Sequence, residues 1–149
     1  MKIVIISDTH GDFYELKRVA MIENGANMFL HAGDVEAFGD ENISPFAAVK
    51  GNCDYGFSKF PKEFWAQTPY GLLYMRHYPY FGKEELESFY QKGARILVHG
   101  HTHIKENKMY KDMFILCPGS LTKPRDDSAS YLVLDVTEKE VKVIFKLYK

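Results

Sequence analysis

Apolar residues along the chain follow two periods, and these periods predict the secondary structure. The run Ile3-Val4-Ile5-Ile6 has no polar face and predicts a fully buried strand over residues 2–7. Residues 12–24 repeat apolar side chains at helical spacing, so we expect a helix there, and residues 28–31 are a second short buried strand. Strand, helix and strand in this order indicate a right-handed crossover and therefore parallel pairing.

The rest of the chain carries mainly strand patterns. Residues 63–68 and 72–77 flank Pro69-Tyr70-Gly71 and predict a hairpin, whereas residues 83–92 have helical spacing. Residues 141–148 alternate strictly, which is typical of a strand with one buried face. The remaining expected strands cover residues 47–50, 95–99, 104–110, 114–117 and 131–136. The pattern predicts an α/β (α+β) fold in which two β-sheets pack as a sandwich flanked by helices.

Composition narrows the class of protein. With 149 residues, no linker and no internal repeat, the chain is expected to form one domain over residues 1–149. Lys and Arg total 19 against 20 for Asp and Glu, so no charge excess favours nucleic acid or a membrane surface as partner. The apolar run at residues 3–6 is too short for a signal peptide. Cys53 and Cys117 have neither zinc-pair nor disulfide spacing, which favours a reduced, cytoplasmic setting.

Polar residues that can bind metal follow several of the predicted strands. Loops that leave the carboxyl ends of parallel strands can converge on one site. Imidazole, carboxylate and amide donors together suit manganese, iron, zinc, nickel or cobalt, and are too rich in imidazole for calcium or magnesium. In extended backbone, residues two apart point the same way, so Asp8-Thr9-His10 and His101-Thr102-His103 should each direct two ligands to the site. The candidate ligands are Asp8, His10, Asp34, Asn52, His77, His101 and His103.

Each of these signals has an ordinary structural explanation when it stands alone. An Asp-x-His triplet occurs by chance, Gly33-Asp34 and Gly51-Asn52 are common turn sequences, and His77 lies beside aromatic residues that can pack around it. Gly100-His101-Thr102-His103 is more specific, because two alternating imidazoles after a glycine are seldom needed for packing. The joint occurrence of all these segments, each after a strand, favours a metal site.

The ordered series of motifs resembles the calcineurin-like metallophosphoesterase superfamily and, within it, the small YfcE-type phosphodiesterases. The resemblance runs from residue 3 to about residue 135. It rests on Ser7-Asp8-Thr9-His10-Gly11, His31-Ala32-Gly33-Asp34, Gly51-Asn52-Cys53-Asp54, His99-Gly100-His101-Thr102-His103 and Pro118-Gly119-Ser120. It implies a metallophosphoesterase-like β-sandwich, two divalent metals with manganese ahead of nickel, iron, zinc and cobalt, and a small phosphodiester substrate such as a nucleotide.

The resemblance also implies roles for the candidate ligands. It assigns the first metal to Asp8, His10 and His103, the second metal to Asn52, His77 and His101, and both metals to Asp34. Two such ions, about 3.5–4 Å apart, hold a bridging hydroxide that attacks phosphorus. They also neutralise the charge that develops on the phosphate oxygens. These residues would therefore act in catalysis through the metals.

Two positions depart from the wider superfamily pattern. Larger members have His after the Asn, whereas this chain has Cys53, a poor substitute as proton donor. Our hypothesis is that the reaction relies on the metals and on substrates with good leaving groups. An equally weighted alternative for Cys53 is that its side chain fills a small apolar gap. His77 is followed by Tyr78 where the family usually has Gly, so Tyr78 either shapes the mouth of the pocket or marks a displaced ligand.

Other residues near the motifs have structural interpretations that we favour. His31 and His99 are expected to be structural or to support the ligands, and Lys123 and Arg125 to lie in a solvated loop rather than on phosphate. A group of aromatic residues is expected to pack or to form a homo-oligomer interface rather than to stack on a nucleobase. The group comprises Tyr55, Phe57, Phe60, Tyr78, Tyr80 and Phe81.

Three other functions are compatible with parts of the sequence pattern. The superfamily includes a retromer subunit that acts chiefly in protein assembly, but such scaffolds typically lose metal ligands, and every candidate position is filled here. A nuclease would need a basic groove, and the chain has no Lys/Arg cluster. A regulator that binds a nucleotide without turnover has no specific motif in its favour. The sequence therefore favours an enzyme, and the preference for diesters is what the resemblance to the YfcE-type phosphodiesterases implies.

Overall fold

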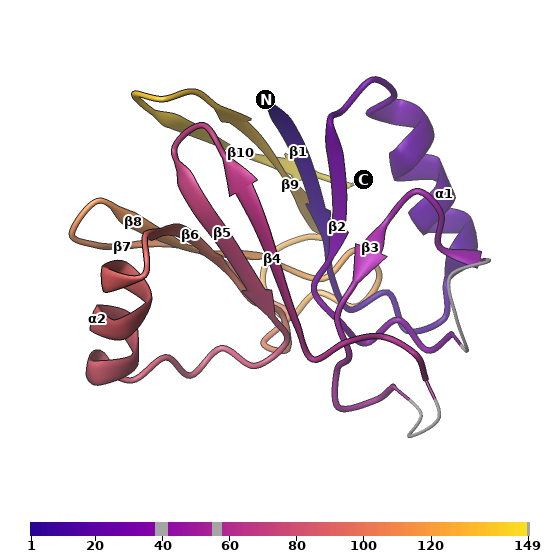
Figure 1. Cartoon of the computed structure of the whole chain (residues 1–149). Coiled ribbons are helices and arrows are strands. Elements are labelled where there is room, and N and C mark those ends of the chain that lie inside the picture. The colour runs from indigo at the N-terminus through magenta and orange to yellow at the C-terminus, as the bar shows by residue number, and fades with distance from the viewer. Residues whose placement is uncertain (38–41, 55–57, 149) are drawn as a thin grey trace.

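The fold, taken from a computed structural model that describes residues 1–37, 42–54 and 58–148, is a sandwich of two mixed β-sheets (Figure 1). The helices are α1 (Phe13–Ile22) and α2 (Lys83–Gln91). The strands are β1 (Lys2–Ile6), β2 (Met28–His31), β3 (Ala47–Ala48), β4 (Glu63–Thr68), β5 (Gly71–Arg76), β6 (Ala94–Val98), β7 (Lys105–Tyr110), β8 (Met113–Pro118), β9 (Ser130–Val136) and β10 (Val141–Leu147). The strand orders are β10-β9-β1-β2-β3 and β4-β5-β6-β8-β7. The predicted α+β sandwich is confirmed.

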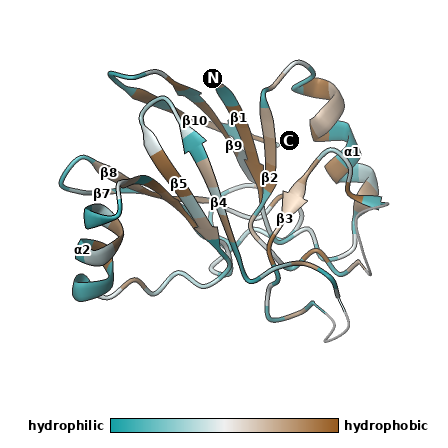
Figure 2. Ribbon diagram, in the orientation of Figure 1, coloured by the Kyte–Doolittle hydropathy of each residue, from teal (hydrophilic) through white to brown (hydrophobic). Residues whose placement is uncertain are grey.

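Alternation within the strands divides the apolar core into layers. Ile3 and Ile5 of β1 pack with apolar residues of the second sheet, whereas Val4 and Ile6 face α1. All four are fully buried, which explains why this run has no polar face. On the outer side of the second sheet, Phe89 of α2 covers the strands. Figure 2 shows the apolar residues concentrated on the strands, while α2 is mostly hydrophilic.

The parallel strands of both sheets end at the same edge of the molecule. β1, β2 and β3 are parallel to one another, as are β5, β6 and β8. The loops after β1, β2, β3 and β5 gather at the lower edge of the view in Figure 1. Because the candidate ligands follow these strands, the topology brings them together as the sequence predicts.

The observed boundaries differ from the predicted ones by one or two residues in most elements. The carboxylate of Asp12 accepts a hydrogen bond from the backbone N–H of Glu15, so Asp12 caps α1 and is not part of it. The alternation over residues 141–148 predicts that Leu147 shares a face with Val141, which is 8% exposed, but Leu147 is 63% exposed, so the buried face does not extend to the end of β10. Among the described residues, no helix is long and apolar enough to cross a membrane.

A buried carboxylate connects α1 to the first sheet. Glu23, at the end of α1, is 2% exposed and accepts hydrogen bonds from the Tyr131 hydroxyl (2.6 Å) and Lys146 Nζ (2.9 Å). Lys2 Nζ lies 3.0 Å from its other oxygen. Burial alone would raise the pKa of Glu23, but the hydrogen bonds from Tyr131, Lys146 and Lys2 outweigh burial and lower the pKa to about 2.

The low pKa of Glu23 predicts a loss of stability in acid. Because the folded pKa lies below the ordinary value of 4.5, this contribution is fully present above pH 4.5 and is lost as the pH falls toward 2. We expect Glu23→Gln to lower the free energy of unfolding at pH 7 by about 3 kcal/mol and to flatten its dependence on pH below 4.5. Urea denaturation between pH 2 and 7 measures both effects.

The matched control is Glu138→Gln, which changes an exposed carboxylate in the turn between β9 and β10. We expect this variant to keep the wild-type profile. An unfolding free energy that depends on pH equally in wild type and Glu23→Gln would contradict the role of this carboxylate.

Candidate metal centre

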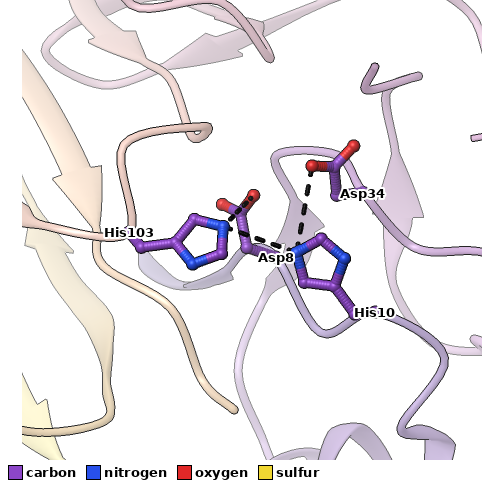
Figure 3. Close-up of side chains that lie close together, drawn as sticks. All are labelled: Asp8, His10, Asp34 and His103. Carbon is purple, nitrogen blue, oxygen red and sulfur yellow. Dashed lines mark hydrogen bonds and ion pairs between the residues drawn. The ribbon is translucent and has the colours of Figure 1, made fainter. Parts of the chain in front are cut away.

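The candidate ligands form two adjacent groups at the carboxyl edge of the sheets. The first group is Asp8, His10, Asp34 and His103, and the second is Asp34, His77 and His101. Within each group the ligand atoms all lie within 4.8 Å of one another, and Asp34 belongs to both. Figure 3 shows the four side chains of the first group pointing toward one another.

Asn52 belongs to the second group through its amide oxygen. Asn52 Oδ1 lies 2.9 Å from His77 Nε2 and 3.1 Å from His101 Nδ1. His77, which the unusual neighbour Tyr78 might have displaced, therefore lies with the others. Every residue that the sequence nominates as a ligand is found in one of the two groups or in contact with it.

The ligand residues have a backbone conformation that the sequence pattern does not indicate. Five of them lie in the left-handed region: Asp8 (φ 55°), His10 (φ 48°), Asp34 (φ 60°), His101 (φ 73°) and His103 (φ 62°). The expectation of extended triplets is therefore wrong. Residues other than glycine seldom adopt this conformation, and it persists where surrounding contacts enforce it, commonly at functional sites.

Hydrogen bonds from distant segments hold Asp8 in this conformation. The Ser120 hydroxyl donates to the Asp8 carbonyl at 2.8 Å, and the backbone N–H of His101 donates to Asp8 Oδ2 at 3.1 Å. The Ser7 hydroxyl donates to the same carboxylate oxygen at 2.5 Å. The Pro118-Gly119-Ser120 string thus has a structural role in the site.

Three of the histidines share one arrangement, in which Nδ1 contacts an acceptor outside the cluster and Nε2 faces into it. The acceptors are Glu36 Oε2 for His10 (2.6 Å), the Ala32 carbonyl for His77 (2.8 Å) and the Lys123 carbonyl for His103 (2.6 Å). Because these oxygens only accept, Nδ1 must carry the proton, and a neutral imidazole then directs the Nε2 lone pair inward. Metal-binding histidines are oriented in this way.

The inward-facing atoms are electron-rich and close to one another. His10 Nε2 and His103 Nε2 are 3.4 Å apart, and His77 Nε2 lies 3.4 Å from Asp34 Oδ2. Asp8 is fully buried, and its Oδ1 has no hydrogen-bond partner among the described residues, although His103 Nε2 lies 3.2 Å away. An unsatisfied buried carboxylate oxygen is unfavourable unless a cation binds it. The donor set therefore fits divalent metal ions.

Contacts within the cluster lower the pKa of Asp34 and raise the pKa values of His77 and His103, whereas burial and the neighbouring His77 lower the pKa of His101. Burial raises the pKa of Asp34, but the contact with His77 and the backbone N–H of Cys53 outweigh burial and lower it. Burial lowers the pKa of His77, but Asp34 and Asp8 raise it by more, so the net shift of this pKa is upward. Carboxylates that stay ionised and imidazoles that attract positive charge are the electrostatic setting of a cation site.

Two glycines allow the ligand loops to approach one another. A Cβ at Gly51 would lie 2.2 Å from Asp34 Oδ1, and a Cβ at Gly100 would lie 2.2 Å from Ser7 Oγ and 3.0 Å from Asp8 Oδ2. Contacts this short exclude any side chain. The glycines of Gly51-Asn52 and Gly100-His101 are therefore required by close packing against the ligand residues.

Asp54 supports the ligand loops through hydrogen bonds that the sequence pattern did not predict. Its carboxylate is 8% exposed and accepts four backbone N–H groups. The donors are Val35 (2.9 Å) and Glu36 (2.7 Å) to Oδ1, and Asp34 (3.1 Å) and Gly51 (2.7 Å) to Oδ2. Asp54 thereby joins the loop that carries Asp34 to the loop that carries Asn52. Its place in Gly51-Asn52-Cys53-Asp54 was the one sequence signal.

The other polar residues of the motifs have the supporting roles that we favoured. His31 is fully buried; its Nδ1 accepts the Gly33 N–H (3.1 Å) and its Nε2 lies 2.9 Å from Thr9 Oγ1, so it braces two ligand loops. Burial lowers the pKa of His31 to about 4, so it stays neutral. His99 is 1% exposed and its Nε2 contacts Glu106 at 2.5 Å. The side chains of Lys123 and Arg125 are exposed.

Cys53 and the aromatic residues differ in part from expectation. Cys53 is exposed, so the alternative that it fills an apolar gap is wrong. Partial desolvation of the sulfur, followed by the charges of Asp34 and Glu36, raises the pKa of its thiol. Phe60 and Phe81 pack into the apolar layers as expected. Tyr80 and Tyr78 are instead 77% and 47% exposed. Tyr55 and Phe57 lie outside the described residues.

Buried carboxylates and imidazoles that meet at one edge of a β-sandwich suit the class of metal-dependent hydrolases. The family model of the calcineurin-like phosphoesterase superfamily domain matches residues 1–139. The chain belongs to this superfamily, and the prediction of a metallophosphoesterase is confirmed.

Named relatives agree with this family. The chain is 30% identical over 153 residues to the probable metallophosphoesterase YsnB of Bacillus subtilis (strain 168), covering 97% of this chain and 90% of the relative. It is 29% identical over 163 residues to phosphodiesterase YfcE of Escherichia coli (strain K12), covering 91% and 88%.

Solved structures share the fold. A conserved uncharacterized protein of Streptococcus pneumoniae TIGR4 superposes with a TM-score of 0.87 at 23% identity, covering 99% of this chain and 89% of the other. Vps29 of Entamoeba histolytica, solved in complex with zinc, superposes with a TM-score of 0.71 at 18% identity over the whole of both chains. At these identities the similarity establishes the architecture alone.

The close approach at Gly100 predicts that a single methyl group disrupts the site. Gly100→Ala should displace Ser7 and Asp8, lower the free energy of unfolding by about 1–3 kcal/mol and weaken metal binding. Thermal denaturation with and without manganese measures both effects. Gly82→Ala is the control, because a Cβ there meets nothing within 4 Å and the backbone has an ordinary φ of −69°. Equal behaviour of the two variants would contradict the close approach.

The four hydrogen bonds to Asp54 predict that its charge orders the ligand loops. An Asn side chain can accept at one oxygen only, so Asp54→Asn leaves two N–H groups facing an amide nitrogen. We expect the free energy of unfolding to fall by about 3 kcal/mol and metal affinity to fall about 10- to 100-fold, measured by urea denaturation and calorimetric metal titration. Asp135→Asn, on the exposed face of β9, is the control. Unchanged metal affinity in Asp54→Asn would contradict this role.

Proposed function

We propose that this chain is a single-domain, cytoplasmic phosphodiesterase that hydrolyses small phosphate diesters with two divalent metal ions. The observation that carries the proposal is the shared position of Asp34, which belongs to both ligand groups. A carboxylate has two oxygens and can contact two cations at once. Membership of the superfamily and the similarity to a relative named as a phosphodiesterase support the reaction class.

The proposed ligand assignment follows the two groups. Asp8, His10 and His103 would hold the first ion, and Asn52, His77 and His101 the second, with Asp34 between them. The mixed nitrogen and oxygen donors suit manganese, and also nickel, iron, zinc and cobalt. The free cysteines Cys53 and Cys117 agree with a reducing compartment.

Bound divalent ions supply an activated water for attack on phosphorus and neutralise the charge on the phosphate oxygens. The residues of the chain contribute position and charge. The Asp8 and Asp34 carboxylates are buried and bring negative charge to the site. The contacts of His10, His77 and His103 with outside acceptors hold their rings in place, so little reorganisation accompanies substrate binding. No side chain is proposed as the nucleophile.

The ligand groups include no strong proton donor for the leaving group, and Cys53 is the candidate beside them. Cys53 follows Asn52 at the exposed end of the site, and its raised pKa keeps the thiol protonated. A thiol of this kind is a weak acid, so the chain is suited to diesters whose leaving groups need little assistance.

The second candidate is a scaffold with weak catalysis, which the fold shared with Vps29 makes relevant. The two candidates differ in one respect that can be measured. A scaffold tolerates metal without turnover, whereas an enzyme couples metal occupancy to hydrolysis. The complete set of nitrogen and oxygen ligands in this chain favours the enzyme.

The proposal predicts that activity requires metal and the second ligand group. Protein stripped of metal and reloaded with manganese, nickel or zinc should hydrolyse bis(p-nitrophenyl) phosphate faster than p-nitrophenyl phosphate, and the stripped protein should be inactive. Asn52→Ala and His101→Ala should lower kcat at least about 100-fold, because they remove ligands of one ion. Asn107→Ala, an exposed amide on β7, is the control for Asn52→Ala.

Metal content, measured by atomic spectroscopy on the same samples, separates the outcomes. Full occupancy without hydrolysis of either ester would contradict the enzyme and favour the scaffold. Equal hydrolysis of the diester and the monoester would contradict the preference for diesters.

A further inference from the structure

A pocket of about 560 Å³ adjoins the second ligand group. Its lining includes Asn52 of the second ligand group and Tyr78, together with Lys62, Tyr74 and Arg76. This volume lies within the range of sites that take a small organic ligand. An ester bound at the ligand groups can therefore extend one substituent past Asn52 into this space.

Of the two tyrosines that line this pocket, Tyr74 is 1% exposed and Tyr78 is the more exposed. Its ring lies edge-on to the His77 ring, with centroids 5.3 Å apart, and 5.6 Å from the His101 ring at an interplanar angle of 48°. Tyr78 nevertheless remains 47% exposed. A large ring that rests on two ligand side chains and keeps half of its surface open can pack against a second ring.

Arg76 fixes the loop that carries Tyr78. The Arg76 guanidinium donates to the carbonyls of Tyr78 (Nε, 3.1 Å) and Tyr80 (Nη2, 3.0 Å). It is held in turn by Glu85, at 2.6 Å, and lies 4.0 Å from the centre of the Phe81 ring. The backbone on either side of the exposed ring is therefore anchored. Anchoring this backbone before binding reduces the conformational entropy that the loop loses when a ligand stacks on the ring.

We infer that this pocket selects substrates whose alcohol substituent carries a planar aromatic ring, an aryl group or a nucleobase, which stacks on Tyr78. The inference rests on the proposed function, because it places the substituent of the same diester. It revises, for Tyr78, the expectation that the aromatic residues pack or form a homo-oligomer interface rather than stack on a nucleobase. It also explains the departure after His77, where Tyr78 supplies a surface that glycine cannot. The competing role for Tyr78, a cover that shields His77 and His101 from water, makes no distinction between substituents.

Binding of unreactive phosphonates tests this inference without turnover. The probes are methylphosphonate, phenylphosphonate and the 5′-methylenephosphonate analogue of adenosine 5′-monophosphate, titrated calorimetrically into the manganese-loaded protein. The ring-bearing probes should bind at least about tenfold more tightly than methylphosphonate, which is the lower range of aromatic stacking. Preference for both ring-bearing probes assigns the pocket to aromatic rings in general, and preference for the adenosine analogue alone assigns it to nucleosides.

Variants of the same loop show whether Tyr78 makes the distinction. Tyr78→Ala and Tyr78→Leu should bring the ratio of affinities close to one, whereas Tyr78→Phe should keep it. Tyr80→Ala removes a more exposed tyrosine of the same loop that does not line the pocket, and it should keep the wild-type ratio. Equal affinities for the three probes in wild type would overturn the inference. So would an equal loss for all three in Tyr78→Ala, which is the result expected of a cover.

Hydrolysis of methyl p-nitrophenyl phosphate separates this inference from the proposed function. Turnover of that ester together with equal phosphonate affinities overturns the pocket assignment and leaves the phosphodiesterase standing. Absence of turnover together with a ring preference that depends on Tyr78 overturns the phosphodiesterase and supports the pocket as a ring-binding site.

Discussion

The convergence of electron-rich atoms around Asp34 is the constraint on which the rest of the structure depends. The Nε2 atoms of His10 and His103 lie 3.4 Å apart, and His103 Nε2 lies 3.2 Å from Asp8 Oδ1, a buried oxygen that has no hydrogen-bond partner among the described residues. Such an arrangement is unfavourable for the protein alone, because like partial charges face one another. It becomes favourable when cations occupy the centre. The fold therefore has to hold these atoms together against their mutual repulsion.

The sandwich does so from outside the cluster. The parallel strands end at one edge and place the ligand loops there. Acceptors outside the cluster, such as Glu36, contact the Nδ1 atoms and thereby orient the imidazoles. Asp54 joins two of the loops through four backbone N–H groups, and Ser120 anchors the carbonyl of Asp8. The left-handed backbone at the ligands is maintained by these contacts. Stability of the loops and affinity for metal are thus expected to change together when a supporting residue is altered.

Much of the fold and of the ligand set could be predicted from the sequence, because both depend on patterns that are local in the chain. The run Ile3-Val4-Ile5-Ile6 indicates a buried strand, and the ligands follow strands in order. The backbone of the triplets could not be predicted, since the left-handed conformation of His101 is imposed by distant loops. The role of Asp54 was missed for the same reason: its partners lie up to 20 residues away in the chain. The exposure of Tyr78 likewise depends on the fold of the whole loop.

The central claim is that two cation sites share the carboxylate of Asp34. The most direct measurement combines equilibrium dialysis of manganese with electron paramagnetic resonance of the loaded protein. The account predicts two ions per chain whose spectrum shows magnetic coupling, since adjacent ions with a common ligand interact, and loss of that coupling in Asp34→Asn. One ion per chain, or two ions without coupling in the wild-type protein, would contradict it.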